Sequence, residues 1–255
     1  MSSVRPFPST VPLAARPLVL ALLAALLLSV VAPAVAPAVV PAGSALGATG
    51  TYRNPLEPES PVGVVESCAD PSVIRGQQPD DDHLWYLFCT TDPLNDDDRN
   101  AAGDLNFRLI PTFSSPDLVN WTYEGDAFAE RPGWVGDTAG MWAPEITFFN
   151  DRYYLYYAAQ FTDAGPSAIG VATSESPLGP WDDKGEWVFE PDGRWTFDPE
   201  VNVDENGDRW LFFGSYFGGI RARQLTPDGL ATAGGETPIT ICGTTRSPSA
   251  RRGGR

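Results

Sequence analysis

Hydrophobic residues after Gly50 occur in short runs that are rich in aromatic and β-branched side chains. Clusters of Gly, Pro, Asn and Asp separate the runs, and no run shows the roughly 3.6-residue period of an amphipathic helix. Short runs bounded by such turn residues are typical of β-strands and hairpins. The pattern therefore predicts an all-β domain.

The runs form three matching sets, each with a proline at its start, a turn in the middle and a dense aromatic run at its end. The sets are DPSVIRG (70–76) with LWYLFCTT (84–91), APEITFF (143–149) with RYYLYYAAQ (152–160), and DPEVNV (198–203) with RWLFFGS (209–215). A repeat of roughly 50 to 75 residues with about four strands per unit is typical of a β-propeller, in which each unit is one blade. A β-sandwich is the alternative, and the repeated proline favours the propeller.

Two of the aromatic runs are apolar at every position. They are YYLYY (153–157) and WLFF (210–213). Side chains alternate between the two faces of a strand, so a run of this kind is expected to be buried on both faces. A blade that lies between two neighbouring blades provides that environment.

The residue before each repeated proline is a candidate for chemistry. Proline fixes its own φ, pushes the preceding residue toward an extended conformation, and is tolerated at the first residue of a strand. If the first strand of each blade lines a central channel, Asp70 and Asp198 come from distant parts of the sequence to one end of it. The alternative is that each aspartate only caps a turn.

The charge of the chain restricts its partners. There are 33 acidic and 17 basic residues, and the net charge is −16. This argues against a nucleic-acid partner, which requires a basic surface. The acidic clusters DDD (80–82) and NDDD (95–98) lack the alternating ligand spacing of a calcium loop, so we expect solvated turns and no metal site.

Histidine and cysteine chemistry is limited. The single histidine, His83, lies in the acidic turn PDDDH and is expected to be solvated, so neither a Ser-His-Asp mechanism nor a His-rich zinc site is predicted. Cys68 and Cys89 flank a predicted hairpin. They could form a disulfide, but spacing alone leaves the pairing open. Cys242 would then be left over.

The N-terminal segment has the composition of an export signal. Arg5 and Arg16 precede an uninterrupted apolar run (18–31), which a Pro/Ala/Val stretch and small residues follow. We interpret 1–48 as a signal peptide with a Pro/Ala-rich segment, and expect a secreted protein without a membrane anchor after cleavage. An uncleaved N-terminal anchor is the alternative. The globular part is expected at 49–242.

The ordered motifs of the chain resemble those of glycoside hydrolase family 43. They are ADPSVIR, SPDLVNW, MWAPEI and FDPEVNVDENGDRWLFFGSYFGGI, and the resemblance runs from about Asn54 to about Ile220. It implies a five-bladed propeller of which about three blades are present. It also implies hydrolysis of arabinose- or xylose-containing plant polysaccharides with inversion of the anomeric centre, and no cofactor among these residues.

The same resemblance assigns roles to individual residues. Asp70 matches the general base that deprotonates the attacking water, and Asp198 matches the aspartate that tunes the pKa of the general acid. Such roles are what inverting hydrolysis requires of its carboxyl groups. Trp142, Ser215 and Tyr216 are expected at the channel mouth as substrate-binding residues, although Trp142 also has a simple packing interpretation.

The general acid of the family has no match in this chain. It is a glutamate shortly followed by Gly-Pro or Ala-Pro in a fourth blade. Glu145 does not occupy the donor's position, and Glu236 precedes Thr-Pro in the third set. Any family metal would have its ligands in the absent blades as well. We therefore expect a chain that is truncated after the third blade and inactive as written, with a basic, disordered or frameshifted tail at 243–255.

Two other functions remain as alternatives. One is a non-catalytic propeller that binds carbohydrate in the same channel. The other is an enzyme that processes fructosides, which also uses a five-bladed propeller with aspartates near Asp-Pro turns. The extended Asn-Asp-Pro-Asn-Gly and Glu-Cys motifs of those enzymes have no match here.

Overall fold

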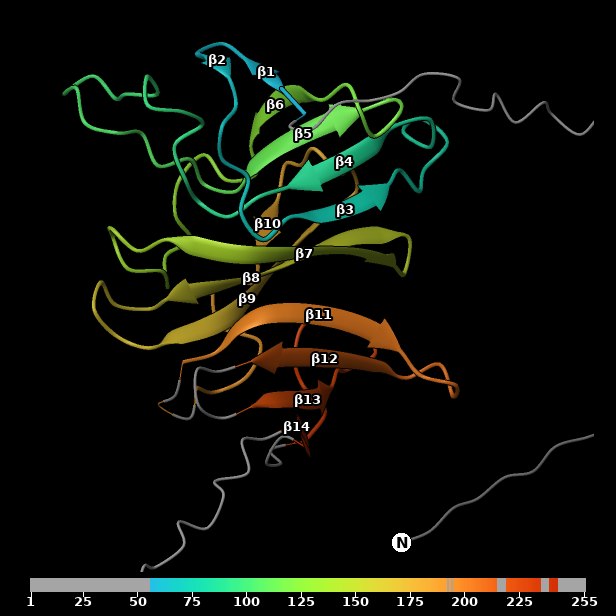
Figure 1. The fold of residues 1–255 in the computed structure, drawn as a ribbon. Coiled ribbons are helices and arrows are strands. Elements are labelled where there is room, and N and C mark those ends of the chain that lie inside the picture. Colours follow the sequence, from blue (N-terminus) through green and yellow to red (C-terminus); the bar gives the residue numbers. More distant parts are fainter. Residues whose placement is uncertain (1–55, 192, 194, 215–218, 235–238, 243–255) are drawn as a thin grey trace, which may run out of the picture. The chain divides into compact units, whose positions relative to one another are not determined.

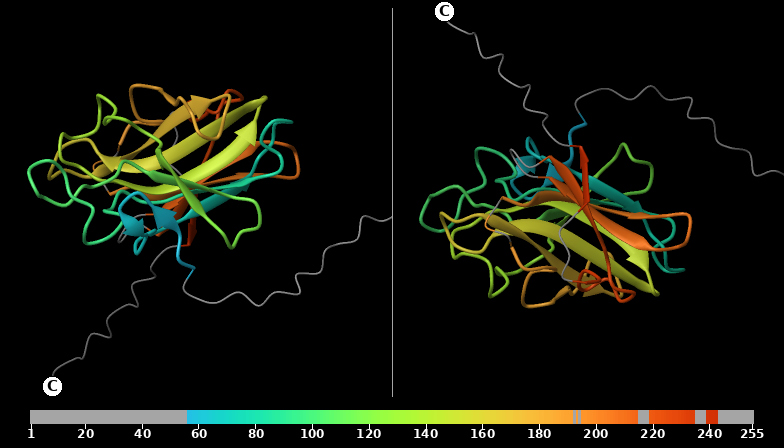
Figure 2. Two further views of the ribbon diagram at one scale, coloured as in Figure 1. Left: turned by 90° about the horizontal axis from the view of Figure 1, so that it is seen from above. Right: turned by 90° about the horizontal axis from the view of Figure 1, so that it is seen from below.

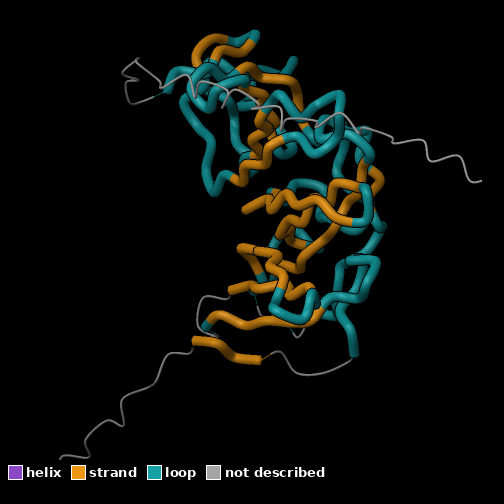
Figure 3. The backbone as a smooth tube through the Cα atoms, turned by 90° about the vertical axis from the view of Figure 1, so that its right-hand side faces the viewer, coloured by secondary structure: helices purple, strands orange, loops and turns teal. Residues whose placement is uncertain are grey.

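The computed structural model describes residues 56–191, 193, 195–214, 219–234 and 239–242, all within the unit Tyr52–Arg255. Every regular element in this part is a strand, which confirms the all-β prediction (Figure 3). The strands are β1 (Glu59–Ser60), β2 (Gly63–Val64), β3 (Ser72–Arg75), β4 (Trp85–Phe88), β5 (Pro111–Ser115), β6 (Thr122–Asp126), β7 (Met141–Phe149), β8 (Arg152–Gln160), β9 (Ser167–Ser174), β10 (Asp182–Asp183), β11 (Phe197–Val203), β12 (Arg209–Gly214), β13 (Ile220–Gln224) and β14 (Ile239–Cys242). No helix suited to crossing a membrane occurs among the residues described.

The strands form three sheets, which follow one another along the chain (Figure 1). Their strand orders are β2-β1-β6-β5-β4-β3, β10-β9-β8-β7 and β11-β12-β13-β14. The strand β7 contacts both β3 and β11, so the first strand of each predicted set lies beside the first strand of the next. Viewed along this stack, the sheets overlie one another (Figure 2).

The three predicted hairpins are confirmed. They are β3–β4, β7–β8 and β11–β12, each antiparallel, with turns at the predicted acidic or Asn-Asp segments. The β1–β2 pair, which joins the first sheet through a parallel bridge from β1 to β6, was not predicted. Strands of two residues give too short a pattern to be seen in a sequence.

Two of the hydrophobic clusters are shared by neighbouring sheets, and a smaller one belongs to the first sheet and its flanking segments. Their burial tests the prediction about the two aromatic runs. The prediction is confirmed for β8, where every residue from Tyr153 to Ala159 is buried. It is wrong for β12, where Leu211 and Phe213 are buried but Trp210 and Phe212 are only partly covered. Leu211 and Phe213 belong to the cluster that the second and third sheets share, and the other two side chains point away from it.

The prediction that the acidic turns are solvated is wrong for one aspartate in each. Asp81 accepts hydrogen bonds from the Tyr153 hydroxyl (2.9 Å) and the Gln78 N–H (2.8 Å). Asp98 is 1% exposed and accepts two hydrogen bonds of 2.8 Å from the guanidinium of Arg108. These carboxylates are buried because they satisfy donors that the folded turns would otherwise leave unpaired. His83, in contrast, is exposed as predicted.

Candidate active site

The three proline-containing segments meet at one cavity of about 540 Å³. Each segment contributes the residue before the proline, the proline itself and the residues after it. The lining residues are 70–73, 143–146 and 198–200. Asp70 and Asp198 therefore line one cavity, as the repeat predicts.

The backbone is unusual at the same position of each segment. Asp70, Ala143 and Asp198 have φ values of +46°, +44° and +55°, in the left-handed region that non-glycine residues rarely adopt. The register of the β7–β8 pair shifts between Trp142 and Glu145, and that of the β11–β12 pair shifts between Phe197 and Glu200. The structure thus corrects the extended conformation expected before proline. The positive φ recurs at all three positions that line the cavity, and strained backbone of this kind is concentrated at functional sites.

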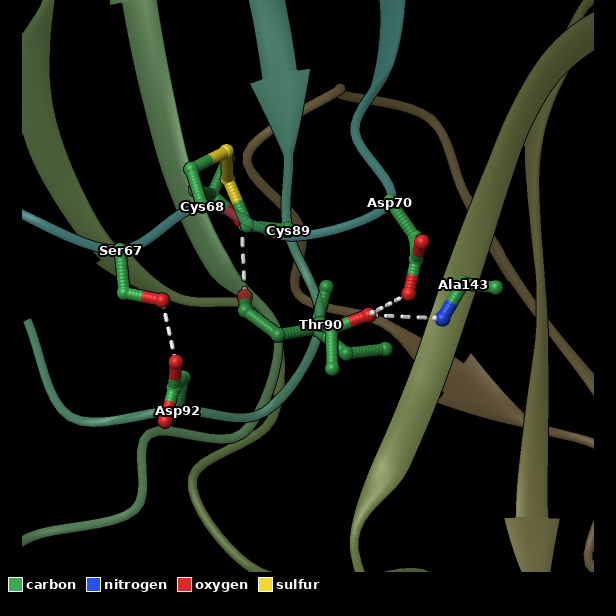
Figure 4. Close-up of a disulfide and its surroundings, with 9 residues drawn as sticks. Ser67, Cys68, Asp70, Cys89, Thr90, Asp92 and Ala143 are labelled. Carbon is green, nitrogen blue, oxygen red and sulfur yellow. Dashed lines mark hydrogen bonds between the residues drawn. A yellow bond between two sulfur atoms is a disulfide. The ribbon is translucent and has the colours of Figure 1, made fainter.

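Thr90 connects the first two segments (Figure 4). Its hydroxyl donates to Oδ2 of Asp70 (3.3 Å) and accepts a hydrogen bond from the backbone N–H of Ala143 (2.9 Å). Its own N–H donates to the carbonyl of Ala69 (3.0 Å). One side chain therefore fixes the orientation of the Asp70 carboxylate relative to β7.

The disulfide that the spacing left open is formed between Cys68 and Cys89, with their Cα atoms 5.0 Å apart. Cys68 is two residues from Asp70, and Cys89 is adjacent to Thr90 (Figure 4). Cys89 is fully buried in a small cluster with Phe113 and Trp121. The bond therefore joins, close to the cavity, the two segments that carry the Asp70 carboxylate and its hydrogen-bond donor.

Asp198 is the second carboxylate of the predicted pair, and it lines the same cavity as Asp70. Partial burial of its carboxyl group and, secondly, the negative charge of Asp70 raise the pKa of Asp198. Both effects disfavour the ionised form. The two aspartates therefore interact electrostatically across the cavity.

The residues that directly follow the first two prolines, Ser72 and Glu145, form a hydrogen-bonded pair in the same cavity. The hydroxyl of Ser72 donates to Oε2 of Glu145 (2.9 Å) and accepts from the N–H of Ile146 (3.2 Å). Burial, followed by the negative charge of Glu200, raises the pKa of Glu145 to about 7. The Glu145 carboxyl group therefore keeps its proton to a higher pH than an ordinary glutamate does.

Comparison with known proteins places this arrangement in a family. The sequence model described as glycosyl hydrolases family 43 matches residues 49–253. The chain belongs to glycosyl hydrolases family 43. This agrees with the resemblance seen in its ordered motifs.

Family 43 relatives that act on arabinan are among the similar proteins. The chain is 35% identical over 157 residues to the extracellular exo-α-(1→5)-L-arabinofuranosidase ArbA of Cellvibrio japonicus, covering 56% of this chain and 41% of ArbA. It is 32% identical over 126 residues to the extracellular endo-α-(1→5)-L-arabinanase 1 of Bacillus subtilis, covering 46% and 39%.

Solved structures give the same result. The α-L-arabinanase of Cellvibrio cellulosa complexed with arabinohexaose has a TM-score of 0.56 and 29% identity, covering 72% of this chain and 56% of that one. The native Bacillus subtilis arabinanase Arb43A has a TM-score of 0.54 and 27% identity, covering 69% and 57%. The chain thus spans about half the length of these family 43 proteins or less.

The other predicted family 43 site residues are placed less simply. Trp142 directly precedes Ala143 but lines a neighbouring cavity, and its ring stacks on that of Trp195 at 6.3 Å and 25°. The contact with Trp195 agrees with the packing interpretation, and the role of Trp142 in binding substrate stays a prediction. Ser215 and Tyr216 lie outside the described residues, as do Glu236 and the segments 1–48 and 243–255.

Sequence reasoning did not select Ser72, Thr90 or Glu200 as site residues. Two of them had a signal, because Ser72, Glu145 and Glu200 each directly follow the proline of their segment. Residues at equivalent positions of a repeat reach the same place in the fold, so the repeat could have identified them. Thr90 had no such signal, since its contacts with Asp70 and Ala143 arise only in the folded chain.

Proposed function

We propose that this chain is the part of an arabinan-degrading glycoside hydrolase that binds the polysaccharide and activates water for an inverting reaction. In this proposal the three sheets are three blades of a five-bladed propeller, and the shared cavity lies at the mouth of its channel. The observation that carries the proposal is that Asp70 and Asp198, from separate sheets, line one cavity in a family 43 chain. The arabinan-active relatives support arabinan as the substrate class.

The surroundings of the two aspartates support the roles that the family resemblance gives them. Asp70 is exposed to solvent, so its carboxylate can accept a proton from a water molecule, and the hydrogen bond from Thr90 orients it. That water would attack the anomeric carbon on the face opposite the leaving oxygen. Asp198 would act on the general acid, which is the group that protonates this oxygen, because a negative charge beside a carboxylic acid raises the pKa of that acid.

No glutamate of this sequence matches the family's general acid, and we assign that role to no residue. We therefore expect the 255-residue chain to bind arabinan without cleaving it. A non-catalytic carbohydrate-binding protein would behave in the same way, so this alternative needs a separate test. Trp142, Ser215 and Tyr216 are proposed as contacts to the sugar, and secretion is proposed from the N-terminal segment and the extracellular relatives.

The substrate class can be tested by native electrophoresis of the full chain in gels that contain linear arabinan, xylan or no polysaccharide. Linear arabinan is expected to slow migration, and xylan is not. Equal mobility in all three gels would refute the proposal.

Catalysis is separated from simple binding by an activated substrate. Dinitrophenolate departs without being protonated, so hydrolysis of dinitrophenyl α-L-arabinofuranoside requires the base and not the acid. The chain lacks a matched acid and is expected to be inactive on arabinan, but this compound needs no acid, so it is the one substrate that the chain is expected to hydrolyse. Asp70→Asn should abolish that reaction. Asp208→Asn, at an exposed aspartate in the β11–β12 turn, is the matched control. If arabinan binds but the unaltered chain does not hydrolyse the activated substrate, the non-catalytic alternative is correct.

A further inference from the structure

We propose that a second cavity, next to the carboxylate cavity, is a subsite for a distal sugar of the bound polysaccharide, with Phe107 as its stacking surface. This inference rests on the proposed function. The cavity has a volume of about 580 Å³, and its lining residues include Phe107, Arg131, Asp137 and Trp142. None of these lines the cavity of Asp70 and Asp198.

The two cavities are adjacent because consecutive residues of β7, and of the segment that follows β4, lie at both of them. Along β7, Trp142 lines the second cavity and Ala143 lines the first. Beside it, Thr90 bonds to Asp70 and Ala143, whereas Thr91 lines the second cavity and exchanges hydrogen bonds with Met141 (2.8 and 3.1 Å). A linear oligosaccharide bound at the carboxylates can therefore continue into the second cavity.

Phe107 is an aromatic side chain held at the surface. It is 53% exposed, although exposing a ring of this size to water gains nothing for folding. Its two neighbours in the chain are both fixed by the buried Asp98. The amide of Asn106 donates to Oδ1 of Asp98 (3.3 Å), and Arg108 donates to both of its oxygens (2.8 Å each). The ring is thus carried by a backbone ordered before any ligand arrives, which lowers the entropy cost of binding.

The remaining lining groups suit a neutral sugar. Trp142 adds a second aromatic ring, while Asn106 and Asp137 add an amide and an exposed carboxylate. The guanidinium of Arg131, whose Nε donates to the carbonyl of Ala139 (2.7 Å), adds further N–H donors. A sugar presents apolar C–H faces, which fit the aromatic rings, and hydroxyl groups, which fit a few hydrogen-bond donors and acceptors.

The test is calorimetric titration of the full chain with arabinotriose and arabinohexaose. The longer sugar is expected to bind more tightly because it reaches the second cavity. Phe107→Ala should reduce the ratio of the two association constants by about three- to tenfold, the range that stacking energies allow. Phe107→Tyr should restore the ratio. Leu178→Ala, which truncates another exposed apolar side chain outside both cavities, should leave it unchanged.

The ratio distinguishes a lost subsite from general damage, because damage weakens both sugars equally. An unchanged ratio in Phe107→Ala, whether or not both affinities fall, would overturn the subsite while leaving the proposed function intact. If the unaltered chain binds neither sugar, the proposed function itself fails, and the subsite fails with it.

Discussion

Replacing Glu145 with glutamine should stabilise the protein in alkaline solution and have little effect in acid. The carboxyl group of Glu145 is partly buried and lies near Glu200, and both features oppose its ionisation. The variant Glu145→Gln keeps the shape of the side chain and an oxygen for the Ser72 hydroxyl, but it carries no charge at any pH.

The magnitude follows from the pKa difference between the folded and unfolded chains. The pKa of Glu145 rises from 4.5 to about 7 on folding. A raised pKa means that the folded state binds the proton more tightly, so the contribution of this group to stability is fully present below pH 4.5 and is lost as the pH rises through 7. The complete loss amounts to about 3 kcal/mol, and solvent screening at the open cavity reduces the expected value to about 1–3 kcal/mol.

The assay is urea unfolding followed by tryptophan fluorescence, from about pH 4.5 to about pH 8.5. The free energy of unfolding of Glu145→Gln should exceed that of the unaltered protein by about 1–3 kcal/mol at the alkaline end and by less than about 0.5 kcal/mol at the acid end. Glu130→Gln, at an exposed glutamate outside the cavity, controls for loss of one negative charge. Parallel pH curves for the unaltered protein and Glu145→Gln would refute the argument that this carboxyl group is held protonated by its surroundings.

Three further changes test the supports of the site. Removing the disulfide by Cys68→Ala with Cys89→Ala should lower the free energy of unfolding by about 3 kcal/mol, because the 21-residue loop is no longer closed in the unfolded chain. Thermal unfolding of this variant should not respond to dithiothreitol, and a continued response would contradict the pairing. Asp98→Asn leaves the Arg108 guanidinium without its carboxylate, so the free energy of unfolding in urea should fall by about 3 kcal/mol. A decrease no larger than that caused by replacing an exposed turn aspartate would show that the ion pair is not important. Tyr153→Phe removes the hydroxyl that accepts from the Gln77 N–H and donates to Asp81, and should lower the free energy of unfolding by about 1–3 kcal/mol in the same assay. An unchanged free energy of unfolding would mean that water replaces the hydroxyl group.

The repeated segments show how much of the site was readable in advance. The position before the proline identified Asp70 and Asp198 because the same local sequence produced the same bend three times. Equivalent bends in neighbouring sheets direct their side chains to a common cavity. The expected extended backbone was nevertheless wrong at these positions, since the rule for residues before proline is a local steric preference that pairing within the folded sheets can override.

The acidic turns illustrate the limit of the same approach. A cluster of aspartates predicts solvent exposure from composition alone, and most members of the two clusters are exposed. Asp81 and Asp98 differ because Tyr153 and Arg108 approach them in the folded chain. Composition contains no information about such partners.

The sequence by itself determined the all-β class, the three hairpins, the two aspartates of the cavity and the family, because each depends on side chains close together in the chain or on a repeat of them. The tertiary structure decided the rest. The Ser72 hydroxyl meets Glu145 across 73 residues of sequence, and the Ala143 N–H meets Thr90 across 53. Burial and neighbouring charge set the pKa of Glu145, and both exist only after the sheets have packed.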